Sequence, residues 1–461
     1  MKNLRFACTC VLVMAAVAAA GQYDQSKINK KAIESYNQAL EKAQDGRYND
    51  AIGLLKEAIQ KDAKYIDAYL SLAGIYGQIK NHSLSVAQYE KAFSLDTNYT
   101  SDYRLPYSIN LAGLGQFNKA LQTIDALLTR SSLADATKKA ALYRKKTYQF
   151  AVDFEKAHAS DGYVFTPKNL GEGINTAESE YFPSLPIAGS EIIFTRRING
   201  FNEDFFGALK NGEAWSRAVR LTGSINTAQN EGAQNISQDG NWLVFTGCNR
   251  EGGYGSCDLY ISYVTNSGWS EALNLGGTVN SDQWDSQPCL SPDKRDLYFA
   301  STRPGGFGGS DLYVSHLLAN GRWSEPENLG PSVNTAADEF CPFIHADNQT
   351  LYFTSNGLPG YGDQDIYLVR KSSEGKWETP QNLGYPVNTT SQEGTLFIAA
   401  DGKTAYYASD RSEGKGGLDI YSFDLRPDIR PNKTLWVRGK VFDQKTNAGL
   451  PSAVELTDLA S

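Results

Sequence analysis

The chain has 461 residues, of which 41% are hydrophobic and 21% charged, so it has the composition of ordinary globular protein and the length of about three domains. Its 26 Tyr, 20 Phe and 42 Gly favour strands and tight turns. The formal net charge is −8 with acidic and basic residues interspersed, so no basic field exists to neutralise a phosphate backbone. We therefore expect no nucleic-acid partner.

Residues 1–21 have the pattern of a secretory signal peptide. Lys2 and Arg5 precede an apolar run over 6–17, and small residues follow at 18–21. The run is shorter than the roughly 20 apolar residues of a membrane-spanning helix. We expect export and cleavage after residue 20 or 21, and no direct membrane span.

A period of 34 residues follows. Leu55 and Tyr89 are 34 residues apart, and the segment 46–51 matches the segment 115–120. This period predicts helix-turn-helix repeats, and over roughly residues 30–130 the sequence resembles the tetratricopeptide repeat (TPR) family. A further helical pattern from about residue 133 would cap the stack, so we expect a helical repeat domain over 30–158.

A second period of 54 residues occupies the middle of the chain. An Asn followed by Thr or Ser recurs at spacings of 51, 54, 54 and 54, together with an Asp-apolar-aromatic motif and a Trp. In the segment 285–330, strands are expected at 287–290, 296–300, 311–315 and 323–327. Four-stranded units repeated at this length predict propeller blades. The repeated residues are Asn175, Asn226, Asn280, Asn334 and Asn388; Asp204, Asp258, Asp311, Asp365 and Asp419; and Trp215, Trp269, Trp323 and Trp377.

The two ends of the repeat predict how the ring closes. Residues 165–171 copy the end of a fourth strand, 326–330, while the last unit, 393–425, lacks a fourth strand. We predict that 165–171 supplies the outer strand of the last blade, which removes an exposed sheet edge. The expected domain is a five-bladed β-propeller over 162–427.

The units, exemplified by Ser291-Pro-Asp293 and by Gly308-Gly-Ser-Asp-Leu-Tyr313, resemble the WD40-like PD40 repeats of TolB-type proteins. The segment 434–461 resembles the first strands of a carboxypeptidase-regulatory-like β-sandwich, too short to complete one. The expected fold class is thus multidomain: an α-helical TPR solenoid, an all-β five-bladed propeller and a partial β-sandwich at the C-terminus.

This order of modules is similar to that of Bacteroidota OmpA-family periplasmic proteins, some associated with the type IX secretion system. The resemblance implies a periplasmic, outer-membrane-associated protein. It implies peptidoglycan binding only through a downstream OmpA-like domain, which this sequence does not contain.

An acidic residue stands five positions after every repeated Asn. Fivefold recurrence favours an architectural role, namely an inter-blade hydrogen bond at each turn that crosses from one blade to the next. Binding of a ligand or cation stays open, because the crossings and the Gly-rich loops should emerge on the same face of the ring. The residues are Glu180, Glu231, Asp285, Glu339 and Glu393.

Four cysteines follow the signal pattern and would enter an oxidising compartment. Cys248 and Cys257 stand at the end of a second strand and the start of a third, which pair antiparallel, so we predict a disulfide between them. Cys289 and Cys341 belong to first strands of successive blades, and we predict no pairing for them.

No pattern of catalysis is evident. The four histidines, His82, His158, His316 and His345, have no ligand-spaced neighbours, and no Gly-x-Ser-x-Gly nucleophile motif occurs. The Gly-rich loops run from strand to strand, without the helix N-terminus that a phosphate loop needs. We expect no catalytic residue, metal or cofactor.

These features favour a non-enzymatic scaffold or tether. It would contact envelope proteins through the TPR groove and the propeller face. The alternative is a module that binds glycans or peptidoglycan fragments through loop aromatics, namely Tyr254, Phe307 and Tyr361.

Overall fold

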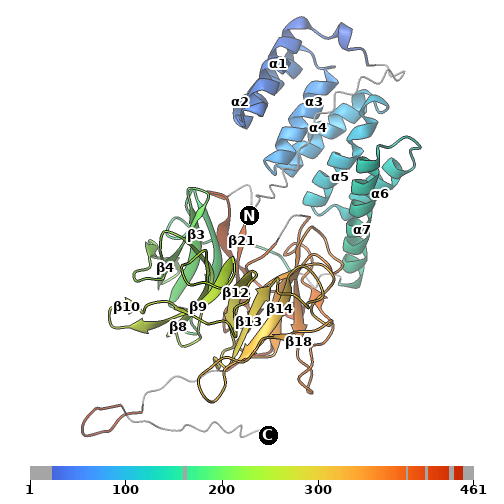
Figure 1. The fold of residues 1–461 in the computed structure, drawn as a ribbon. Helices are drawn as coiled ribbons and strands as arrows, with labels where there is room; N and C mark the ends of the chain where they lie inside the picture. The colour runs from blue at the N-terminus through green and yellow to red at the C-terminus, as the bar shows by residue number, and fades with distance from the viewer. Residues whose placement is uncertain (1–22, 159–162, 391–392, 411–413, 436–440, 450–461) are drawn as a thin grey trace.

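The computed structural model describes residues 23–158, 163–390, 393–410, 414–435 and 441–449. A helical solenoid stands on one side of a five-bladed β-propeller (Figure 1), so the expected combination of a TPR-like solenoid and a propeller is confirmed. The predicted signal peptide lies outside the described residues. So does most of the predicted partial β-sandwich, of which the described part contains a bridge between Phe442 and Gly449.

The helical domain consists of antiparallel helix pairs. Small residues lie where paired helices approach, since Ala51, Ser85 and Ala120 are fully buried. Ser85 donates its hydroxyl to the carbonyl of Ala73 at 2.7 Å, which satisfies the one polar group among them. The helices are α1 (Lys30–Gln44), α2 (Tyr48–Lys61), α3 (Ile66–Gln78), α4 (His82–Leu95), α5 (Arg104–Gly113), α6 (Phe117–Leu128) and α7 (Asp135–Ala157), with 3₁₀ turns η1 (Gln25–Lys27) and η2 (Tyr99–Tyr103).

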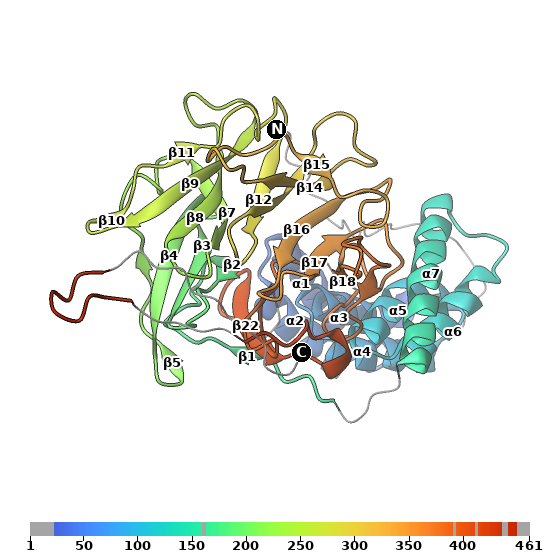
Figure 2. The same ribbon diagram turned by 90° about the horizontal axis from the view of Figure 1, so that it is seen from below.

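The propeller has five antiparallel sheets arranged around one axis (Figure 2). Alternating apolar side chains of neighbouring sheets pack together between the blades, where the core of this domain lies. Blade 1 contains β2 (Ser179–Ser184), β3 (Glu191–Ile198), β4 (Asn202–Asn211), β5 (Ala214–Trp215) and β6 (Val219–Arg220). Blade 2 contains β7 (Asn230–Ile236), β8 (Trp242–Cys248), β9 (Cys257–Thr265), β10 (Gly268–Trp269) and β11 (Leu273–Asn274).

The remaining blades have four strands each, and a 3₁₀ turn, η3 (Pro427–Ile429), follows them. Blade 3 contains β12 (Asp285–Leu290), β13 (Asp296–Ser301), β14 (Asp311–His316) and β15 (Glu327–Asn328). Blade 4 contains β16 (Glu339–Ile344), β17 (Thr350–Ser355), β18 (Asp365–Arg370) and β19 (Gln381–Asn382). Blade 5 contains β20 (Phe397–Ile398), β21 (Thr404–Ser409), β22 (Asp419–Asp424) and β1 (Lys168–Asn169).

The fourth strands are shorter than predicted and begin later. In blade 3 the prediction was 323–327, whereas β15 is Glu327–Asn328. Trp323 forms only a bridge to Leu317, closing the hairpin. Pro326, which has no N–H to donate to the ladder, separates that bridge from the strand.

The predicted ring closure is confirmed. β1 pairs antiparallel with β22, with Lys168 opposite Ser422 and Asn169 opposite Tyr421. The amide of Leu170 then donates to the carbonyl of Ile420 at 3.1 Å. The strand before blade 1 thus completes blade 5, and the two ends of the propeller hold each other.

Candidate interaction surface

The repeated acidic residues lie inside the turns that cross from blade to blade. Glu180, for example, is fully buried and accepts hydrogen bonds from the amide and hydroxyl of Thr176 at 3.1 and 2.6 Å. An arginine also binds it, with Arg196 Nε 2.7 Å from the carboxylate. The same turn recurs at Glu231 with Thr227, Asp285 with Ser281, Glu339 with Thr335, and Glu393 with Thr389.

The arginine partner varies among the blades. Arg250 binds Glu231 at 3.0 Å and Arg303 binds Asp285 at 2.7 Å, as in blade 1, but in blade 4 the hydroxyl of Ser355 donates to Glu339 at 2.6 Å instead. The corresponding Arg411 of blade 5 lies outside the described residues. These arginines were not predicted, although residues 196, 250 and 303 repeat in the sequence at spacings of 54 and 53.

The predicted inter-blade hydrogen bond at the acidic residues is made by their backbone amides, since Glu180 donates to Leu418, Glu339 to Ser310 and Glu393 to Gln364, at 2.7, 2.8 and 3.0 Å. The side chains of the repeated asparagines make a second set of inter-blade hydrogen bonds. Asn226 accepts from the amide of Phe205 at 2.7 Å and donates to the carbonyl of Phe205 at 3.0 Å, which ties the crossing to the preceding blade. An Asn side chain offers both an acceptor and a donor, whereas a carboxylate only accepts. The other pairs are Asn280 with Leu259, Asn334 with Leu312, Asn388 with Ile366, and Asn175 with Ile420, which closes the ring.

Removal of divalent cations is expected to leave the propeller unchanged, because the carboxylates accept from hydroxyls and amides of their own turns, and three of them also bind an arginine of the same blade. Among the described residues, no group of three His, Cys, Asp or Glu side chains is arranged to hold a metal ion. Thermal unfolding with and without a chelator checks this expectation. A lower melting temperature after chelation would restore the cation-binding interpretation of the acidic ring.

The Gly-rich loops and the Asn crossings meet on one face of the ring, as predicted. The amide of Ser256 donates to the carbonyl of Gln283 at 3.0 Å, and the amide of Gly309 donates to Ala337 at 2.9 Å. A Cβ on Gly255 or Gly308 would lie 1.8 Å from a carbonyl oxygen of the neighbouring crossing. These two glycines are therefore required because the loop backbone and the crossing backbone approach too closely for a side chain. This steric role adds to the role in turn conformation that glycine usually has in such loops.

Three of these loops carry an aromatic residue at the equivalent position, and their exposures differ. Tyr254 is 54% exposed and Phe307 is 49% exposed, but Tyr361 is only 1% exposed. The exposure that the glycan-binding alternative requires is therefore present at Tyr254 and Phe307 but not at Tyr361. The helical domain covers Tyr361, a contact between distant parts of the chain that no local pattern indicates.

Tyr361 is the centre of the contact between the two domains. Its ring lies 5.3 Å from Phe117 of α6 and 5.4 and 6.0 Å from Phe150 and Phe154 of α7, measured between centroids. Tyr143, also on α7, donates its hydroxyl to the carbonyl of Gly362 at 2.8 Å. Figure 2 shows α7 alongside the blade that contains β17 and β18.

Asp365 lies behind this contact, and its titration is expected to make the stability of the folded chain pH-dependent. Burial raises the pKa of Asp365 to about 7, although the amide of Tyr361 and the side chain of Asn382 donate to its carboxylate. The pKa in the folded state lies above that in the unfolded chain, so this group's contribution to stability is largest in acid and is lost as the pH rises towards 7.

The midpoint of denaturant unfolding, measured from pH 5 to 8, should therefore fall more steeply in the parent than in an Asp365→Asn variant. The equivalent Asp311→Asn change in blade 3, where no helical domain covers the loop, serves as the control. Equal pH slopes for the parent and Asp365→Asn would contradict this account.

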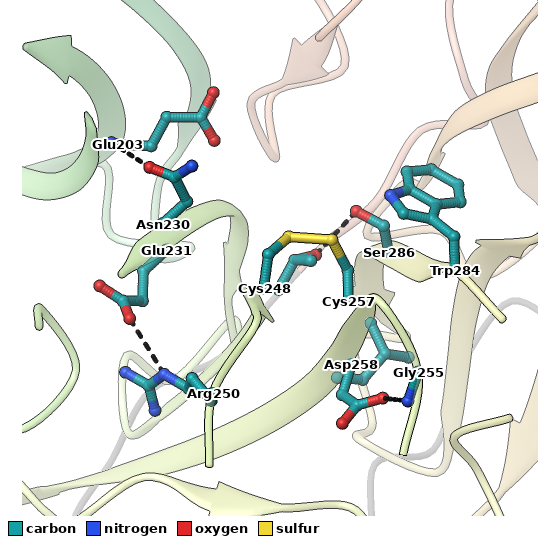
Figure 3. Close-up of a disulfide and its surroundings, with 12 residues drawn as sticks. Glu203, Asn230, Glu231, Cys248, Arg250, Gly255, Cys257, Asp258, Trp284 and Ser286 are labelled. Carbon is teal, nitrogen blue, oxygen red and sulfur yellow. Dashed lines mark hydrogen bonds and ion pairs between the residues drawn. A yellow bond between two sulfur atoms is a disulfide. The ribbon is translucent and has the colours of Figure 1, made fainter. Parts of the chain in front are cut away.

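The structure joins Cys248 and Cys257 in a disulfide at the ends of β8 and β9 (Figure 3). The Glu231–Arg250 pair lies on one side of it and Asp258 with Gly255 on the other, so the disulfide holds the base of the loop that carries Tyr254. Cys289 and Cys341 are free thiols, and burial raises their pKa values to about 12 and about 11.

Replacing both Cys248 and Cys257 by serine should lower the free energy of unfolding by about 2–3 kcal/mol, because the crosslink closes a loop of about 10 residues. Urea unfolding of the oxidised parent and the variant measures this difference. Native protein should react with thiol reagents at none of its four cysteines beyond the signal pattern. Mass spectrometry that finds the thiols of Cys248 and Cys257 free in exported protein would refute the disulfide.

The axis of the propeller is nearly filled. The innermost segment of each blade has one residue with a positive φ, between 51° and 58°, and in blades 1 to 4 this residue lies at a bulge of the innermost strand. These inner segments surround a cavity of about 30 Å³, which holds roughly one or two water molecules. The positive-φ residues repeat with the same spacing as the asparagines, and they are Phe182, Ala233, Gln287, Cys341 and Thr395.

The helical domain has a larger hollow of about 330 Å³ between α4, η2, α5 and α6. Phe93 and Tyr107 form its apolar part, and Arg104 and Lys119 contribute positive charge. The start of α3 is covered by the segment before α1, since Tyr23 donates its hydroxyl to Asp67 at 3.0 Å. The hollow lies towards the half of the helical domain that contacts the propeller.

No helix in the described part of the chain is long and apolar enough to cross a membrane.

No protein-family model matches the chain, and no curated protein matches it significantly. Among solved structures, a putative TolB from Agrobacterium tumefaciens is similar over 54% of this chain and 84% of its own, at 13% identity and a TM-score of 0.35. An α-L-arabinofuranosidase from Lactobacillus brevis is similar over 57% of this chain and 97% of its own, at 14% identity and a TM-score of 0.41. The first TPR domain of Spaghetti (RPAP3), bound to an HSP90 peptide, is similar over 28% of this chain and 94% of its own, at 15% identity and a TM-score of 0.24.

Proposed function

We propose that this chain is a non-enzymatic scaffold or tether of the bacterial cell envelope, which holds other proteins through its helical groove and its propeller face. The proposed location is the periplasm, in association with the outer membrane, within a complex of the type IX secretion kind. The observation that carries the proposal is the docking of the helical domain on blade 4 through Tyr361, which fixes two interaction modules in one orientation.

Two further observations support this function. The repeated polar residues hold the turns of the propeller, and the axial cavity of about 30 Å³ is far smaller than the roughly 300–1,000 Å³ of a small-molecule site. The exposed loop aromatics and the hollow of the helical domain offer surface for protein partners. The export pattern and the Cys248–Cys257 disulfide support the periplasmic location.

The test is affinity purification of the tagged full chain from native envelope extracts. One or a few envelope proteins should co-purify in fixed ratio. A chain that purifies alone from freshly solubilised envelopes would overturn the proposal.

Glycan or peptidoglycan-fragment binding is the second candidate, supported by the exposure of Tyr254 and Phe307. The burial of Tyr361 removes one of the three aromatics on which this candidate depended. Binding of the purified chain to a glycan array, lost on replacing Tyr254 and Phe307 by alanine, would favour it over the scaffold.

A further inference from the structure

The loops of blades 2, 3 and 4 have the same local structure around their aromatic residue. The amides of Tyr254, Phe307 and Tyr361 each donate to an aspartate four residues on, at 2.7, 2.5 and 2.5 Å. The amide of the next glycine donates to the other oxygen of the same aspartate, at 3.0, 3.0 and 3.3 Å. Each aromatic side chain is thus presented by a loop that is already ordered, which lowers the entropy lost on binding.

The loop of blade 4 shows what kind of surface such an aromatic binds. Phe150 and Phe154 are four residues apart on α7, and both rings contact Tyr361. Tyr143 of the same helix donates to the carbonyl of the glycine that follows the aromatic. The complementary surface is therefore mainly one face of an amphipathic α-helix that carries aromatic rings at helical spacing and a hydrogen-bond donor, with Phe117 of α6 packing beside it.

The equivalent surface of blades 2 and 3 is continuous with this interface. A Cβ on Gly357 of the blade 4 loop would meet Thr335, and one on Gly308 of the blade 3 loop would meet the backbone of the same crossing. The ring of Tyr254 lies against Gly277 on one side and remains half exposed. The surface of blade 4 that the helical domain covers is therefore continuous with the surface that carries Tyr254 and Phe307, because each turn between blades contacts the loops on both sides of it.

We propose that Tyr254 and Phe307 form a second docking surface, which binds an amphipathic α-helix of a partner protein in the way that Tyr361 binds α7. This inference rests on the proposed scaffold function, and it names the surface by which the scaffold holds one of its partner proteins. The partner is a different protein rather than a second copy, because the aromatic face of α7 is already occupied by Tyr361 of its own chain.

Site-specific photo-crosslinking in native cells tests the proposal on the full chain. A photoreactive phenylalanine replaces Tyr254 or Phe307 one at a time, and the crosslinked residue is identified by mass spectrometry. The same group at position 361 is the positive control and should crosslink within the chain to α6 or α7. Position 273 is the negative control, because Leu273 is 52% exposed on the outer rim of blade 2.

Both loop positions should crosslink to an α-helix of one envelope protein. Replacing Tyr254 and Phe307 together by alanine should reduce retention of that protein by about tenfold or more, since buried aromatic anchors dominate interface affinity. Leu273→Ala should retain it. Crosslinks to a non-helical segment, to a glycan or to a second copy would overturn the docking surface, as would their absence.

The Tyr254→Ala/Phe307→Ala variant distinguishes a failure of the docking surface from a failure of the proposed scaffold function. If it retains the partner at the parent's level, the docking surface is wrong and the scaffold function stands. If the parent chain itself retains no envelope protein, both are wrong.

Discussion

Deletion of residues 161–172 is expected to destabilise the whole propeller. The deletion removes β1 from blade 5, and with it the ring of Phe165, whose centroid lies 4.9 Å from that of Phe423. It also removes Asn169, which donates to the buried carboxylate of Asp419 at 2.7 Å. Phe165 is partly buried, and its loss together with several hydrogen bonds amounts to roughly 3–5 kcal/mol, while the strand edge left behind favours aggregation.

Urea unfolding and limited proteolysis measure this effect, with the length-matched variant Phe165→Ala/Asn169→Ala as control for the shortened connection. Helices α1–α4 should resist protease because they have their own core, whereas the propeller should be degraded. A deletion variant whose propeller unfolds at the parent's denaturant concentration would contradict ring closure through β1.

Replacing Tyr361 by alanine is expected to release the helical domain from the propeller. The ring contacts aromatic side chains of both α6 and α7, and truncation of a buried aromatic costs about 3–5 kcal/mol. A Cβ on Gly115 or Gly384 would meet the ring of Tyr385 or Phe154, so the two domains approach each other closely around Tyr361.

Small-angle scattering and hydrogen exchange measure the release. The radius of gyration should increase and amides of α7 should exchange faster, while the propeller unfolds as in the parent. Tyr361→Phe keeps the ring and should behave as the parent, in line with the Phe307 that blade 3 carries at this position. An unchanged radius of gyration in Tyr361→Ala would show that other contacts, such as the Lys80–Asp410 ion pair, fix the domains.

The repeats made much of this fold predictable, because each repeated residue has the same task in every blade. The spacing of Asn175 to Asn388 predicted five blades, and the copied motif at 165–171 predicted which strand closes the ring. Such repetition reveals the position of a residue but not its partner. The acidic residues were placed in the right turns, but the prediction did not show that their amides make the inter-blade hydrogen bond while their carboxylates bind the turn itself.

What could not be predicted depends on contacts between the domains. Tyr254, Phe307 and Tyr361 occupy equivalent positions in sequence, and only the packing of α7 on blade 4 separates the buried residue from the exposed ones. Local periodicity contains no information about which blade the helical domain covers.

The central claim is that the chain acts as one rigid scaffold for envelope proteins. The most direct test is quantitative affinity purification from cells that carry the parent, Tyr361→Phe or Tyr361→Ala at equal abundance. The account predicts that the parent and Tyr361→Phe retain the same envelope proteins in fixed ratio, and that Tyr361→Ala, whose domains are uncoupled, loses some of them. Equal retention by all three chains, or no retained protein with any of them, would contradict it.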